Sequence, residues 1–247
     1  MTSTSMMLEV PWRIGPGEEI QLGEATIKRT EEGDLEACDM YGCVSARVPP
    51  ERFVYVVPIP AIYRVLSATP YIYVDFMKRI LIEEDEDYWT LAPIELEVYA
   101  GELALVRLSP IMVKHTLIGD VLEGILSRYY KADAVFDEDQ LEYKLGTAIV
   151  RFIVKGSSVL LPGVGFNASG VEFYVDEQGR LYYPLLEVNV EGGVVSVKRM
   201  DEPPKKGLKP VKLESYRSRR VPLPVSLAYA TPFTMKVDVV RRYLPQP

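Results

Sequence analysis

The chain has 247 residues, of which 48% are hydrophobic and 26% charged, and its formal net charge is −7 at pH 7. This composition excludes intrinsic disorder, a collagen-like repeat and a disulfide-dense scaffold. The acidic balance argues against nucleic acid as a partner of the whole surface, although it permits a local basic patch.

The overall composition favours an all-β protein. The 19 Pro and 17 Gly supply frequent turns, and β-branched and aromatic residues are abundant. We predict stacked antiparallel sheets, arranged as a β-sandwich or a jelly-roll, with at most one or two short helices. We expect one all-β domain over residues 1–247, or two β-rich halves divided near 133–140.

In the first half, strand-like segments alternate with turn residues. The predicted strands cover residues 7–13, 20–30, 52–57, 71–82, 89–99 and 102–108. Pro58 and Pro60 confine the third of these to a sheet edge or a strand end. Ala100 and Gly101 between the last two predict a tight hairpin.

The middle of the chain carries two conflicting signals. Between Ile118 and Tyr129 the apolar residues fall at helical spacing, which favours an amphipathic helix. Gly119 and Gly124 weaken that helix, and the segment that follows has an extended pattern. Periodicity therefore leaves helix and hairpin both open.

The second half again predicts strands, with a linker-like stretch at 203–210. The strands cover residues 141–155, 171–175, 181–190, 194–199, 221–230 and 233–243. The turn at Asp176–Gly179 predicts a hairpin between two of them.

Amide residues are scarce, because the chain has two Asn and four Gln beside abundant Glu, Lys and Arg. This bias is typical of hyperthermophiles. Hyperthermophile cytosols tolerate structural disulfides, so Cys38 and Cys43 are either a disulfide or two buried thiols. A zinc site would need two more good ligands, and a single His with no further Cys argues against one.

The centre of the chain contains four characteristic segments, at residues 92–98, 108–110, 114–119 and 124–132. In that order they resemble an archaeal family known as domain of unknown function 432. The resemblance implies an archaeal source and a mostly β protein, with residues 114–132 as a β-hairpin. The family often has an aromatic residue after the Lys where this chain has His115, so His115 is not a family-wide catalytic group. The resemblance implies no activity.

Several catalytic classes find little support in the sequence. The glycines from Gly163 to Gly170 have the wrong spacing for a dinucleotide loop and precede a predicted strand, and no Walker motif occurs. His115 is the only imidazole, which excludes most nucleophilic and zinc mechanisms. Glu95 and Glu97 share a strand face and could form a carboxylate pair, but we interpret them as solvent-facing. We predict no cofactor and no metal.

Two surfaces remain as candidate binding sites. Arg128, Tyr130, Lys114 and His115 could hold a small anionic or sugar-like ligand. Residues 198–220 contain nine basic and three acidic residues, a net charge of +6, so the rest of the chain carries −13. The candidate electrostatic patch consists of Lys205, Lys206, Lys209, Lys212, Tyr216, Arg217, Arg219 and Arg220.

The function favoured by the sequence is a non-catalytic binding or interaction module in the cytoplasm, with homo-oligomerisation through strand edges. One alternative is a carboxylate- or metal-dependent enzyme, for example a carbohydrate-active one. Another is electrostatic binding of an acidic partner or, less favoured, nucleic acid through residues 198–220. No membrane span is expected, because no apolar run approaches 18 residues and the start of the chain lacks a secretory signal.

Overall fold

The computed structural model describes residues 10–62, 70–118, 124–192 and 194–211. This part of the chain is all-β, as predicted, and its one helical element is the short 3-10 helix η1 (Glu138–Gln140). The strands are β1 (Trp12–Ile14), β2 (Glu19–Leu22), β3 (Ala25–Arg29), β4 (Asp34–Asp39), β5 (Gly42–Arg47), β6 (Val54–Pro60), β7 (Tyr71–Ile82), β8 (Asp87–Ala100), β9 (Leu103–Leu108), β10 (Lys114–Ile118), β11 (Ile125–Ala132), β12 (Thr147–Gly156), β13 (Val159–Asn167), β14 (Tyr174–Val175), β15 (Leu181–Tyr182), β16 (Leu186–Glu191), β17 (Val194–Arg199) and β18 (Lys209–Pro210).

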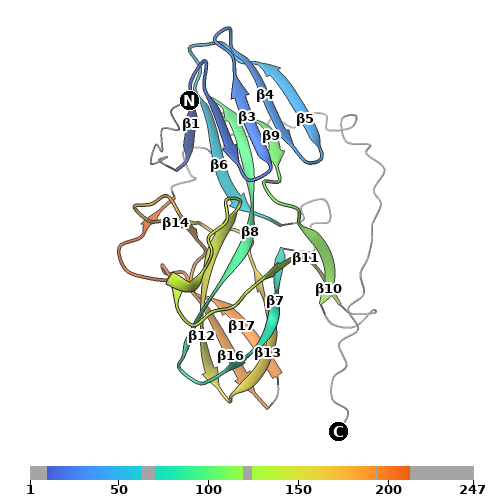
Figure 1. Ribbon diagram of the computed structural model, residues 1–247, viewed down its shortest axis with the longest axis vertical. Helices are drawn as coiled ribbons and strands as arrows, with labels where there is room; N and C mark the ends of the chain where they lie inside the picture. Colours follow the sequence, from blue (N-terminus) through green and yellow to red (C-terminus); the bar gives the residue numbers. More distant parts are fainter. Residues whose placement is uncertain (1–9, 63–69, 119–123, 193, 212–247) are drawn as a thin grey trace.

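Strand β8 connects the two ends of the molecule (Figure 1). Residues 87–93 of β8 pair with β12, and residues 94–100 pair with β6. The upper group in the figure contains β1 to β6 and β9, whereas β7, β12, β13, β16 and β17 lie below. Nearly every residue of β8 is buried, because other elements cover both of its faces.

In the upper group, buried apolar residues alternate with polar ones along β3 and β4, and the buried ones form the core side of the β2–β5 sheet. Ile27, Leu35 and Ala37 point inward and are buried, whereas the residues between them are polar. Arg29 is an exception, since its guanidinium is buried and donates to the carbonyls of Ile14 and Pro49. These bonds link β3 to β1 and to the turn before β6.

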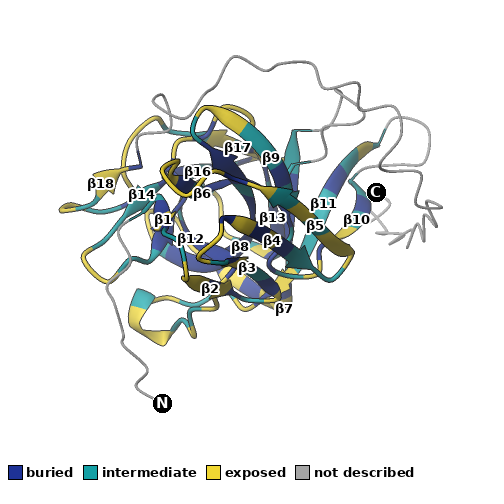
Figure 2. Ribbon diagram, turned by 90° about the horizontal axis from the view of Figure 1, so that it is seen from above, coloured by how far each residue is buried: buried dark blue, intermediate teal, exposed yellow. Residues whose placement is uncertain are grey.

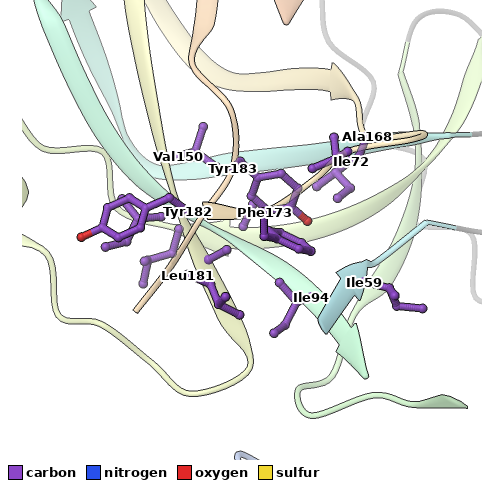
Figure 3. Close-up of a cluster of buried hydrophobic side chains, with 14 of the residues drawn as sticks. Ile59, Ile72, Ile94, Val150, Ala168, Phe173, Leu181, Tyr182 and Tyr183 are labelled. Carbon is purple, nitrogen blue, oxygen red and sulfur yellow. The ribbon is translucent and has the colours of Figure 1, made fainter. Parts of the chain in front are cut away.

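The lower group has an aromatic core between two sheets. Phe76 on β7 stacks on Phe152 of β12, with ring centroids 5.9 Å apart. Phe173 and Tyr183 meet edge to face at 4.8 Å, and Figure 3 shows them with Ile72 and Ala168. Burial of such aromatic pairs stabilises the fold through removed apolar area and ring geometry. Buried residues occupy the interior and exposed ones gather on the surrounding strands and turns (Figure 2).

Several predicted elements match the structure. Strands β7, β8, β9 and β17 lie where expected, and β8 and β9 form the predicted hairpin. Pro58 and Pro60 lie in β6 beyond the residues that pair with β1, so they occupy an edge segment of that strand. The sheets are mainly antiparallel, but β7 with β11, and β12 with β15 and β16, are parallel pairs.

The helix favoured by periodicity was wrong within the described residues. Strands β10 and β11 form an antiparallel pair from Lys114↔Tyr129 to Ile118↔Ile125, as the family resemblance implied. Within β11, Ile125 and Tyr129 lie on one face and Leu126 on the other, and apolar residues on both faces of a strand contribute to a helix-like spacing.

Other boundaries also differ from the prediction. The single strand at 20–30 is the hairpin β2–β3, which turns at Gly23 with φ +62. The strand at 141–155 begins only at Thr147, and that at 171–175 is reduced to Tyr174–Val175. The linker-like stretch packs on the body, with Pro204 and Val211 buried and β18 paired to β14. The strands predicted at 221–230 and 233–243 lie outside the described residues.

Candidate functional site

The four residues of the candidate ligand site do not all share one face. His115 and Arg128 are directly opposed in the β10–β11 pair, and Tyr130 lies two residues along on the same face. Lys114 lies on the other face, opposite Tyr129, and is exposed. The Tyr129 hydroxyl donates to Asp75 at 2.8 Å, which ties this outer face to β7.

Arg128 belongs to a buried charged network, which we call the β8–β9–β11 network. Its Nη2 donates to Glu95 Oε1 at 2.6 Å. Arg107 on β9 donates to Glu97 at 3.0 Å and lies 3.6 Å from Glu95. The Tyr99 hydroxyl donates to Glu97 at 2.6 Å. Each carboxylate therefore has an arginine beside it, an arrangement that holds three strands together.

This network corrects the interpretation of Glu95 and Glu97 as solvent-facing. The Glu95 side chain is only 4% exposed and that of Glu97 is 16% exposed. Alternation placed the pair on one face correctly, but it could not show that the β10–β11 hairpin covers that face. The signal that could have located the site is the two arginines, Arg107 and Arg128, at inward positions of the neighbouring strands.

His115 lies beside this network and is held in the neutral form. Burial and, to a smaller extent, the positive charge of Arg128 together lower its pKa to about 4. A histidine with such a pKa is neutral at pH 7 and contributes no charge to an anion-binding site.

A second polar cluster, which we call the Lys205 clasp, consists of Glu138, Asp176, Arg180, Tyr182 and Lys205. Lys205 Nζ donates to both Glu138 oxygens, at 2.7 and 2.8 Å, and to the Tyr182 hydroxyl at 2.9 Å. Arg180 donates to Asp176 at 2.7 Å and lies 3.2 Å from Glu138. Figure 3 shows the Tyr182 hydroxyl pointing away from the apolar cluster that surrounds Tyr183.

The pKa values of two groups in the Lys205 clasp, Tyr182 and Asp176, are shifted in opposite directions. Burial raises the pKa of Tyr182, and the carboxylates of Glu138 and Asp176 raise it further. Burial alone would raise the pKa of Asp176, but hydrogen bonds from Arg180 and Tyr182 outweigh it and hold that pKa below its usual value. Tyr182 therefore stays protonated and can donate its hydroxyl hydrogen. Through Lys205, the clasp attaches the 203–211 segment to Glu138 and Tyr182.

The Lys205 clasp divides the candidate electrostatic patch. Lys205 forms an ion pair with Glu138, whereas Lys206 and Lys209 are exposed. The other predicted members, Lys212, Tyr216, Arg217, Arg219 and Arg220, lie outside the described residues.

The glycine-rich stretch is part of strand β13. A Cβ atom at Gly163 would clash with the carbonyl oxygen of Val74 and lie 2.6 Å from the Tyr73 hydroxyl. Gly163 therefore allows β13 to approach β7, and the stretch forms no phosphate-binding turn before a helix.

The outer face of the β2–β5 sheet carries an open, partly polar depression. The depression is lined by Lys28, Thr30, Asp34, Leu35, Glu36, Ser45, Ala46 and Arg47. Cys38 and Cys43 form a disulfide across β4 and β5 on this face. Arg47 donates to Asp34 at 2.8 Å.

Strand β5 is the edge of this sheet. The sheet order is β2-β3-β4-β5, and within the described ranges no strand pairs with the outer side of β5. The Cα atoms of Cys38 and Cys43 are 4.1 Å apart, the short spacing of a non-hydrogen-bonded antiparallel pair. By alternation Ser45 is also in such a pair with β4, so its N–H and C=O point toward the free edge.

Comparison with known proteins gives one match. The model of a family described as "Protein of unknown function (DUF432)" matches residues 17–234. No curated protein and no solved structure matches the chain. Among the described residues, none of the helical segments has the length and apolar character that a membrane crossing requires.

Proposed function

Because the chain belongs to the DUF432 family, whose description names no activity, we propose its function from the geometry: it is a non-catalytic interaction module that associates through the edge of β5. The observation that carries this proposal is the row of outward-facing backbone groups on β5. Edge strands of this kind add a strand from another polypeptide by main-chain hydrogen bonds.

We propose a second copy of the chain as the partner. An edge strand that pairs antiparallel with itself makes a symmetric, closed contact, which is the commonest form of homodimer. If Ser45 lies opposite Ser45 of the other copy, the outward N–H and C=O groups of both strands meet. Arg47 is the one charged residue of β5 and lies at its end, so this register places it opposite Cys43 and keeps like charges apart.

Static light scattering over a concentration series tests the proposal. A six-residue edge buries less area than a standard interface, so we expect a monomer–dimer equilibrium that shifts with concentration. Ser45→Pro removes an outward N–H without touching the β4 ladder, and we expect this variant to stay monomeric. Ser45→Ala keeps the N–H and is the matched control. A wild-type chain that is monomeric at all concentrations, or a Ser45→Pro variant that still dimerises, would refute the proposal.

Three further features belong to the same proposal. We propose that the chain folds as one domain, since β8 contributes to both strand groups and one continuous buried cluster spans them. We also propose a cytoplasmic location and an archaeal source, and the scarcity of amides supports a thermophilic one. The exposed Lys206 and Lys209 support only a minor role for residues 198–220 as an electrostatic surface.

A further inference from the structure

We propose that the reduced Cys38–Cys43 pair, together with Glu36, binds a thiophilic divalent cation such as Zn²⁺. The two sulfurs and a Glu36 carboxylate oxygen all lie within 4.8 Å of one another. The proposal does not depend on association through β5.

The strand geometry brings the three ligands to one face. Cys38 and Cys43 are directly opposed on β4 and β5, and Glu36 precedes Cys38 by two residues on β4. Ligand atoms around a tetrahedral zinc ion lie roughly 3.5–3.8 Å apart, given Zn–S and Zn–O distances of about 2.3 and 2.0 Å. Breaking the S–S bond frees both cysteine side chains to rotate apart toward that spacing.

The surroundings leave the three groups accessible. Cys43 and Glu36 are exposed and Cys38 is half-buried, so a reductant and a cation can both reach them. Arg47 is held by Asp34, and no ion pair with Glu36 occurs among the described residues. Two thiolates and one carboxylate fill three positions of a tetrahedron, and the fourth faces solvent.

The sequence argued against zinc because it offers two Cys and one His. The fold changes that argument, since Glu36 joins the two sulfurs although it is neither Cys nor His. His115 lies on the β10–β11 hairpin, outside this group.

The redox step has a defined balance. A dithiol reductant donates two electrons and two protons to the Cys38–Cys43 bond and is itself oxidised to a disulfide. Binding of Zn²⁺ then releases the two thiol protons and forms two metal–thiolate bonds, with a Glu36 carboxylate oxygen as the third ligand. Metal binding therefore competes with reoxidation of the disulfide.

The test compares metal binding by the oxidised and the reduced full-length chain. The disulfide is reduced with a phosphine, which takes up the oxygen of water as it leaves two thiols, and Cd²⁺ is titrated as a spectroscopic substitute for Zn²⁺. We expect a cadmium–thiolate charge-transfer band that saturates at one ion per chain in the reduced protein alone. We also expect Zn²⁺ to slow reformation of the disulfide.

Two variants identify the ligands. Glu36→Gln is expected to weaken Cd²⁺ binding at least about tenfold, whereas Glu19→Gln, an exposed carboxylate at the far side of the same sheet, leaves it unchanged. Cys43→Ser abolishes the charge-transfer band. Equal uptake in both redox states, no uptake by the reduced chain, or an unchanged Glu36→Gln variant would overturn the proposal. Loss of the β-sheet circular dichroism on reduction would also overturn it, because the site requires the intact β4–β5 hairpin.

Discussion

Arg128 on β11 donates to Glu95 on β8 at 2.6 Å, and both side chains are largely buried. Glu95 belongs to the central strand of the molecule and Arg128 to a hairpin that follows it by about thirty residues. The pair therefore fixes where the β10–β11 hairpin lies against β8.

Removing one member of this pair should be costly. Arg128→Met leaves Glu95 buried, with Arg107 3.6 Å away. We expect the free energy of unfolding to fall by about 3 kcal/mol, because the buried Glu95 carboxylate loses the charge-assisted hydrogen bond from Arg128 and the more distant Arg107 compensates its charge only in part. Urea denaturation followed by circular dichroism measures this loss. Arg47→Met, which breaks the exposed pair with Asp34, is the control and should leave stability nearly unchanged. Equal effects of the two variants would contradict a structural role for the network.

The Lys205 clasp should control the order of the segment after β17. We expect Lys205→Met to destabilise residues 203–211 by about 1–2 kcal/mol, since it removes charge-assisted hydrogen bonds to Glu138. Hydrogen exchange at Val211, whose N–H donates to the Phe173 carbonyl at 2.7 Å, reports the change. Lys206→Met, at an exposed neighbour, provides the control. Unchanged exchange in Lys205→Met would show that β18 is held by its other contacts.

His115 should make stability depend on pH in an acidic window. Its pKa falls from an ordinary value of 6.5 to about 4 in the folded chain, so between these values the unfolded chain binds the additional proton. The contribution of neutral His115 is therefore complete above pH 6.5 and is lost as the pH falls toward 4. Because the chain has one His, its NMR titration is unambiguous. A midpoint near 6.5 would contradict the buried environment assigned to it.

The amide-poor composition predicts high thermal stability. We expect a thermal unfolding midpoint above about 90 °C, the range of hyperstable proteins. Differential scanning calorimetry measures this midpoint directly. A value between about 45 and 65 °C would instead be that of an ordinary mesophilic domain and would remove the support for a thermophilic source.

Much of the fold follows from local pattern, whereas the clusters depend on contacts distant in sequence. Strand β7 and the β8–β9 hairpin were predictable because alternation and turn residues are local signals. Periodicity favoured a helix at β10–β11, since apolar residues on both faces of a strand imitate helical spacing. Glu95 appeared solvent-facing because nothing in its own strand shows that Arg128 covers it. Glu138 and Lys205 are 67 residues apart, and no local pattern reveals such a pairing.

Hydrogen exchange of the β5 amides as a function of protein concentration tests the central claim most directly. Association through this edge predicts that the outward N–H groups of Cys43, Ser45 and Arg47 exchange more slowly as concentration rises. The amides of β2, at the opposite edge of the same sheet, should not change. Exchange at β5 that is independent of concentration, in a sample shown by light scattering to contain dimers, would place the contact elsewhere and contradict the account.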